Sequence, residues 1–173
     1  MSRRRHHRFI DALFLATVLS AAGLLGCKPA QPARPGTTTQ PASTAGSESR
    51  LPTTRMAIGK ESFNLEIAYR PEDQETGLMH RKSMSADHGM IFVFPAERNL
   101  TFWMKNTLIP LDIIYADRGG RVVSVKNMKP LDETGVPSDG PVMYAIELNA
   151  GAAARVGVKA GDQLAIPDDL RVP

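Results

Sequence analysis

Residues 89–94 read GMIFVF, and this stretch decides the fold. It is apolar at consecutive positions, so both faces of the segment must be buried, which is typical of a central strand. Residues 142–149, VMYAIELN, are a second largely apolar stretch of strand length. The two together predict a sheet with a hydrophobic core.

Weaker strand signals surround these two stretches. Residues 62–69 alternate strictly between apolar and polar side chains, as a half-buried strand does. Further strands are predicted at 99–105, 111–117, 121–128 and 163–166, and short helices at 72–79 and 150–156. Strands joined by short turns predict a mainly β fold with α+β character: a compact antiparallel β-sandwich or distorted barrel with two short helices.

The N-terminal residues, 1–26, have the features of a signal peptide. Four arginines lie within the first eight residues, and an apolar run of about 14 residues follows at 12–25. A membrane-spanning helix needs about 20 apolar residues, so this run is short for a span. It ends in LLGC at 24–27, directly before Lys28.

Leu-x-Gly-Cys after such a run resembles a bacterial lipobox. The resemblance implies cleavage before Cys27 and a lipid on that cysteine, the only one in the chain. Lys28 is not the aspartate that retains such proteins at the inner membrane. We therefore expect a cell-envelope protein on the outer membrane, facing the periplasm. A cleaved signal without lipid and an uncleaved anchor are the alternatives.

Composition divides the remaining chain into a linker, 27–54, and a domain, 55–173. Of the 27 residues from 28 to 54, 16 are Pro, Gly, Ser or Thr. Such a segment has too little apolar surface to offset the entropy of ordering, which predicts a lipid-anchored disordered linker. Without residues 1–26 the chain has 17 basic and 17 acidic residues, a balance that argues against a nucleic-acid partner.

Three blocks resemble the DUF192 family, a bacterial and archaeal domain of unknown function. They are GLMHRKSMSADHGMIFVF (77–94), FWMKNTLIPLDIIYAD (102–117) and MYAIELNAG (143–151). The resemblance covers residues 54–166 and implies a small β-rich fold without implying an activity. Motif positions are occupied by residues that include Arg81, Trp103, Lys105, Asn106, Asp112 and Glu147.

Trp103, Lys105 and Asn106 follow an apolar run, and alternation puts Trp103 and Lys105 on one face. An aromatic plate beside a cation and an amide suits a sugar or another polar ring. The alternative is that Trp103 is part of the core and that Lys105 extends past it to solvent.

Asp112 and Glu147 interrupt apolar strands, where a charge is unfavourable unless it is paired. Arg81 and Lys105 are the expected partners. The two carboxylates could act as an acid/base pair across a cleft, or they could belong to a buried ion-pair network. His80, Asp87 and His88 lack a tight ligand spacing, so we expect no metal, and no motif implies a cofactor.

These observations leave three functional hypotheses. The first is a small-molecule-binding module with a cleft formed by Arg81, Trp103, Lys105, Asn106, Asp112 and Glu147. The second is an enzyme that uses Asp112 and Glu147. The third is an assembly module that binds an envelope protein through a sheet edge.

Overall fold

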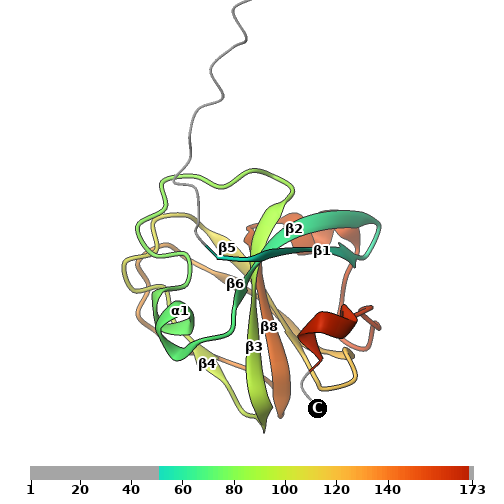
Figure 1. The fold of residues 1–173 in the computed structure, drawn as a ribbon. Coiled ribbons are helices and arrows are strands. Elements are labelled where there is room, and N and C mark those ends of the chain that lie inside the picture. Colours follow the sequence, from blue (N-terminus) through green and yellow to red (C-terminus); the bar gives the residue numbers. More distant parts are fainter. Residues whose placement is uncertain (1–50, 172–173) are drawn as a thin grey trace, which may run out of the picture. The chain divides into compact units, whose positions relative to one another are not determined.

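The computed structural model describes residues 51–171 (Figure 1). Strands dominate, as predicted, with two short α-helices and one 3₁₀ turn. The elements are β1 (Thr53–Ile58), β2 (Glu61–Ala68), α1 (Pro71–Thr76), β3 (His88–Arg98), β4 (Thr101–Phe102), β5 (Leu111–Ala116), β6 (Val122–Met128), β7 (Val136–Pro137), β8 (Val142–Asn149), α2 (Ala152–Val156) and η1 (Asp168–Leu170).

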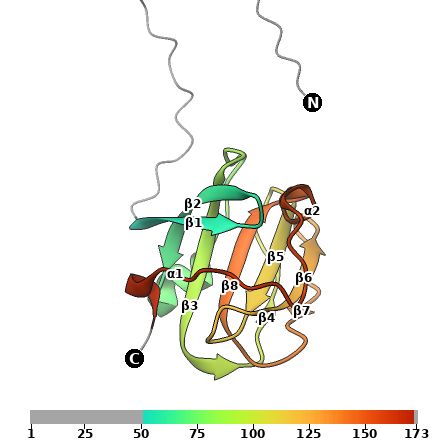
Figure 2. The ribbon, with the colours of Figure 1, turned by 90° about the vertical axis from the view of Figure 1, so that its right-hand side faces the viewer.

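Six strands form one sheet in the order β1-β2-β3-β8-β5-β6, and β4 pairs with β7 in a small second sheet. Figure 2 shows β3, β8, β5 and β6 side by side, with the β1–β2 hairpin across one end. The sheet is mixed rather than wholly antiparallel, because β2 and β3 run parallel. The strands do not close into a barrel, since β1 and β6 remain the two ends of the strand order.

The two stretches that decide the fold, β3 and β8, occupy the centre of the sheet and pair with each other. Gly89 allows their close approach: a Cβ there would lie 2.5 Å from the main-chain oxygen of Glu147. The β3 ladder extends beyond Phe94 to Arg98, with a register shift between Val93 and Arg98.

Hydrophobic cores lie on both faces of the sheet. One core contains Ile58 of β1, Ile146 of β8, α2 and the C-terminal Leu164, which shows that the sheet curls so that distant strands share one interior. The other core contains Met90, Phe92 and Tyr115, and it is covered by residues 77–109 outside the strands. The crossover from β2 to β3, with α1 inside it, lies on this second face.

Several predicted elements differ from the observed ones. The strand predicted at 99–105 is reduced to Thr101–Phe102, because Thr107 N–H bonds to the Met104 carbonyl and forms a turn. The strand predicted at 163–166 is a single bridge between Gln163 and Arg121. Strand β1 begins at Thr53, inside the segment predicted as linker.

Candidate functional site

A small pocket of about 30 Å³ lies over the face of the sheet that carries Phe92. One wall is formed by residues 74–79, which comprise the end of α1 and the turn after it. The remaining lining residues are Phe92, Phe102, Trp103, Thr107 and Glu147. The volume is sufficient for about one water molecule or one hydroxyl-sized group.

Glu147 of β8 supplies a carboxyl group to this pocket while only 4% of the residue is exposed. Burial raises the pKa of this carboxyl to about 8, and the positive charge of Arg81 opposes the rise. At neutral pH the group is therefore mainly protonated, so it can donate one hydrogen bond and accept others. No hydrogen bond to the Glu147 carboxyl occurs within residues 51–171, but its oxygens are not sealed from solvent, because the fully buried polar side-chain atom without a partner in that part of the chain is Ser124 Oγ.

Arg81 makes a two-pronged ion pair with Glu66, a residue that no sequence motif indicates as a site residue. Its two terminal nitrogens lie 2.5 and 2.6 Å from the Glu66 oxygens. Glu66 of β2, Met90 of β3 and Glu147 of β8 are register partners across three adjacent strands, which puts both carboxyls on one face. Arg81 thus has a dedicated partner in Glu66 and also acts electrostatically on Glu147.

Trp103 forms the rim of the pocket and is 47% exposed, so it is not a core residue. The preceding residue, Phe102, fixes its position: the Phe102 ring packs edge-on against Phe92 at 4.9 Å and near Tyr115 at 5.9 Å between centroids. The Lys105 ammonium lies 5.1 Å from the Trp103 ring centre, although both residues follow the end of β4 and do not share the strand face that was predicted.

The loops that border the pocket hold unusual backbone conformations. Within the described part of the chain, the non-glycine residues with positive φ are His80, Asn106 and Leu131. His80 N–H bonds to the Asn106 carbonyl, and Leu131 N–H bonds to the Thr107 carbonyl. Histidine and asparagine adopt positive φ more readily than other non-glycine residues, whereas for Leu131 it is unfavourable and is maintained by tertiary contacts.

Asp112 lies apart from the other candidates. In the β5–β8 register Asp112 pairs with Leu148 while Ile113 pairs with Glu147, so the two carboxylates point to opposite faces of the sheet. Asp112 accepts hydrogen bonds from the Asn127 side chain, at 2.5 Å, and from the Ala153 backbone N–H, at 2.9 Å. Its position therefore gives it a structural role at the start of α2.

The site brings together Trp103, Lys105 and Asn106 on one loop, with Glu147 on the pocket floor and Arg81 near enough to influence its charge. Gln74, Glu75 and Thr107 also line the pocket and were missed as site residues. Thr107 belongs to the quoted 102–117 block, but its burial is set by the turn it forms, which periodicity does not indicate.

The histidines do not assemble a metal site within the described chain. His88 Nδ1 lies 2.8 Å from Asp87 Oδ1, and the pKa of that carboxyl is lowered by the hydrogen bond to His88. No group of three His, Cys, Asp or Glu side chains suited to a metal ion occurs in residues 51–171.

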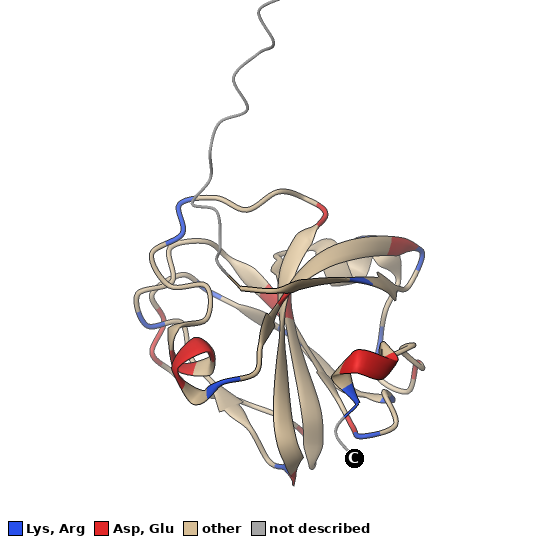
Figure 3. Ribbon diagram, viewed as in Figure 1, with Lys and Arg blue, Asp and Glu red and all other residues tan. Residues whose placement is uncertain are grey.

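Charge is balanced over the described surface. Residues 51–171 contain 14 basic and 16 acidic side chains, and Figure 3 shows the two signs interspersed along loops and helices. No helix of the described residues is long and apolar enough to cross a membrane.

Fold and site define a small, curled, β-rich domain in which the nearly buried Glu147 carboxyl opens into a shallow pocket beside an exposed tryptophan. Residues 54–166 match the family model DUF192, "Uncharacterized ACR, COG1430". The chain belongs to this family, which confirms the resemblance seen in the sequence.

Two solved structures share this fold. One, from Novosphingobium aromaticivorans, is a protein of unknown function with 35% identity and a TM-score of 0.63; the match covers 75% of this chain and 99% of that one. The other, from Sinorhizobium meliloti, is described as a proposed transcription regulator; it has 38% identity and a TM-score of 0.61, with 64% and 89% covered. A search of curated proteins found no match.

Proposed function

We propose that this DUF192 domain is a small-molecule-binding module for a neutral, hydroxyl-bearing ring such as a carbohydrate, tethered in the cell envelope by a lipid on Cys27. The observation that carries the proposal is the Glu147 carboxyl, which is only 4% exposed, makes no hydrogen bond within the described chain and reaches solvent through the pocket, beside a half-exposed Trp103. A carboxyl that meets solvent only through so small a pocket has little room for water, and a ligand hydroxyl could take the hydrogen bond that the described chain does not supply.

The dimensions of the pocket determine how such a ligand would bind. About 30 Å³ admits one hydroxyl group, not a ring, so the ring itself must lie outside. Trp103 offers an apolar plate at the rim for the flat face of a sugar, and Asn106 is exposed on the same loop. A protonated Glu147 suits an uncharged ligand, since it can both donate to and accept from a hydroxyl.

The proposed binding site omits Asp112, which belonged to the cleft expected from the sequence. That residue faces the other side of the sheet, where both its oxygens have partners. The same geometry removes the physical basis for an acid/base enzyme that uses Asp112 together with Glu147, because one substrate cannot reach both faces of a packed sheet.

Cellular location is the second part of the proposal. It is supported by the leader at 1–26 and by the single cysteine placed directly after it. Lys28, rather than aspartate, favours the outer membrane.

The test is a thermal-shift panel on the full chain with neutral mono- and disaccharides, N-acetylated amino sugars, peptidoglycan fragments, amino acids and nucleotides. A ligand at about 100 times its Kd stabilises the folded state by about 2.7 kcal/mol, which raises the Tm by several degrees in a domain of this size. A shift confined to the neutral sugars supports the proposal, whereas a flat panel would refute it.

Trp103→Ala should abolish the sugar-dependent shift and change the Tm of the free protein by little, because the side chain is half exposed. Tyr69→Ala is the matched control, since Tyr69 is 56% exposed and does not line the pocket. If Trp103→Ala bound sugar normally, the ligand would not lie on Trp103.

A further inference from the structure

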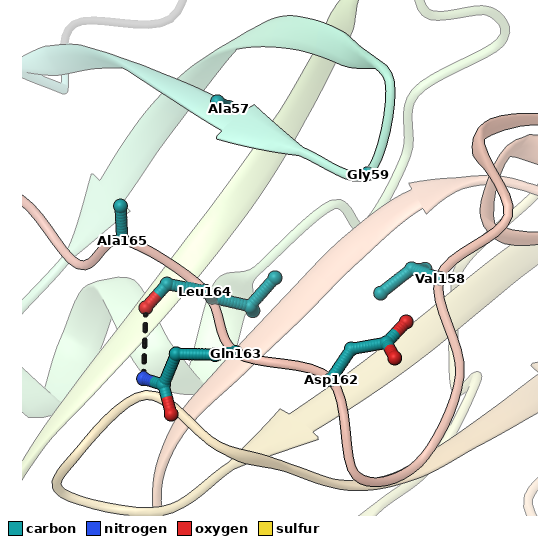
Figure 4. Close-up of a pocket in the computed structure, with 7 residues that line it drawn as sticks. All are labelled: Ala57, Gly59, Val158, Asp162, Gln163, Leu164 and Ala165. Atoms are coloured by element: carbon teal, nitrogen blue, oxygen red, sulfur yellow. Dashed lines mark hydrogen bonds between the residues drawn. The ribbon is translucent and has the colours of Figure 1, made fainter.

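A second opening, of about 350 Å³, lies on the other side of the sheet, between the β1–β2 hairpin and the C-terminal segment 162–165. Figure 4 shows Ala57 and Gly59 on one side of this opening and Gln163, Leu164 and Ala165 on the other. The curl of the sheet brings these segments together around one core, to which Ile58 and Leu164 both contribute.

One wall is the free edge of β1. Ile58 and Glu61 close the two-residue hairpin, and Ile67 N–H bonds to the Pro52 carbonyl, so the even-numbered residues of β1 face β2. The ladder of an antiparallel pair alternates, so the N–H and C=O groups of Arg55 and Ala57 point away from β2, and those of Ala57 lie at the opening.

The opposite wall is a second free edge. Leu164 N–H bonds to the Gly120 carbonyl, and Gln163 bridges to Arg121. Gln163 and Ala165 are exposed while Leu164 and Ile166 are buried, which is the alternation of a strand. Within the described residues the N–H groups of Gln163 and Ala165 have no backbone acceptor, and that side of the segment faces the opening.

The β1 edge lacks most of the usual protection against strand addition. Natural edge strands are commonly blocked by lysines, prolines or bulges. The six residues of β1 contain one charged residue, Arg55, and neither proline nor a register shift. The side chains that flank the opening at Ala57 and Ala165 are methyl groups, which leave room beside the backbone.

We propose that this groove, bounded by Ala57 and Ala165, binds an extended peptide segment of a partner protein as an added strand that completes the curled sheet. The added backbone bonds to β1 on one side and to residues 163–165 on the other, in the manner of β-augmentation. Residues with small side chains should face the floor formed by Val158 and Leu164.

The two walls also argue against a second copy as the occupant. The β1 strand of another copy is already part of a sheet, with β2 on one side and its own segment 162–165 across the groove. Such a strand cannot enter between two edges, whereas an unpaired extended segment can.

The experiment fuses a probe heptapeptide, TATVTAT, to the C-terminus of the full chain through 12 Gly/Ser residues. A flexible linker of that length spans roughly 20 Å and gives an effective concentration in the millimolar range, enough to detect a weak interaction. Amide hydrogen exchange is then measured by NMR at Arg55, Ala57, Gln163 and Ala165. The control fusion has proline at every second position of the probe.

The proposal predicts that these four amides exchange at least about tenfold more slowly with the TATVTAT fusion than with the proline control. Ala57→Pro, which removes an outward N–H without removing a bond to β2, should abolish that protection. Ala165→Pro serves the same purpose on the other wall if Ala57→Pro fails to fold.

Three outcomes would overturn the proposal. Equal exchange in both fusions would mean that the groove does not bind a strand. Protection of these amides in the unfused chain would assign the groove to a segment of the chain itself. Protection that increases with protein concentration would assign it to a second copy.

Discussion

At the scale of single residues, Glu147 determines the chemistry of the pocket because its proton depends on burial. Its pKa is raised to about 8 in the folded state, so the folded protein holds a proton that the unfolded chain releases near pH 4.5. The protonated carboxyl contributes to stability most fully below pH 4.5, and that contribution is lost as the pH rises through about 8.

Glu147→Gln should therefore remove the part of the pH dependence of the free energy of unfolding that comes from this carboxyl. The wild-type free energy of unfolding should fall between pH 5 and pH 8, by up to about 1.4 kcal/mol per unit relative to the Gln variant. Urea unfolding at several pH values measures this difference. Parallel curves for the two proteins would show that Glu147 does not hold a proton in the folded state.

We expect Arg81 to affect the stability of the fold through the two carboxyl groups beside it, those of Glu66 and Glu147. Arg81→Met leaves Glu66 buried without its partner and should destabilise the fold by about 3–5 kcal/mol at pH 7. The double variant Glu66→Gln, Arg81→Met should recover much of this loss, because no buried charge is then left unpaired. Denaturation midpoints test both, and equal losses in the single and double variants would contradict the ion-pair explanation.

At the scale of elements, a single side chain anchors α2 to the sheet. Helix α2 has five residues, and its N-cap residue, Gly151, provides no side chain to cap it. Asp112, from β5, supplies the acceptor instead, through its bond to the Ala153 N–H.

Asp112→Ala should thus lower stability by about 1–3 kcal/mol and leave sugar binding at Trp103 unchanged. The matched control is Asp139→Ala, whose side chain is 61% exposed and whose loss should change stability by less than about 1 kcal/mol. Loss of binding without loss of stability in Asp112→Ala would return Asp112 to the site.

The elements also show which features can be predicted from sequence. A continuous apolar run identified β3, and apolar residues on one face identified β8. Trp103 and Lys105 lie close together as expected, but after the end of β4 and not on the strand face from which this was predicted. Strand β1 was missed because its apolar alternation is short and follows a polar segment. The parallel pairing of β2 with β3 was missed because the intervening helix has only six residues.

The candidate site could be predicted only in part: the burial of its carboxyl groups follows from the sequence, but their positions relative to one another do not. Burial of Asp112 and Glu147 follows from the apolar residues around them, and the structure bears this out with exposures of 1% and 4%. Their separation does not follow, because the face that each occupies depends on the β5–β8 register. The pattern of apolar residues within each strand does not determine the register between two strands that lie 26 or more residues apart in the chain.

At the scale of the whole molecule, the proposed lipid on Cys27 leads to a testable prediction about where in the cell the protein lies. Cys27→Ser should abolish incorporation of labelled palmitate and release the chain from the membrane fraction. Incorporation by the unaltered chain is the necessary control. If Cys27→Ser stayed with the membrane, an uncleaved anchor would replace the lipid; if the unaltered chain took up no label and was not retained, an ordinary cleaved signal would explain the leader.

The strand order has a consequence for the time at which the domain can fold. Strands β1, β2 and β3 form one half of the sheet and β5 and β6 the other, and only β8 pairs with both halves. Because β8 comes last in the chain, the two halves cannot join until residues 142–149 are available, which raises the contact order and slows folding. This delay would suit the export proposed above, through a channel that threads unfolded chains: the central strand arrives last, so the polypeptide stays competent for threading until almost all of it has been made.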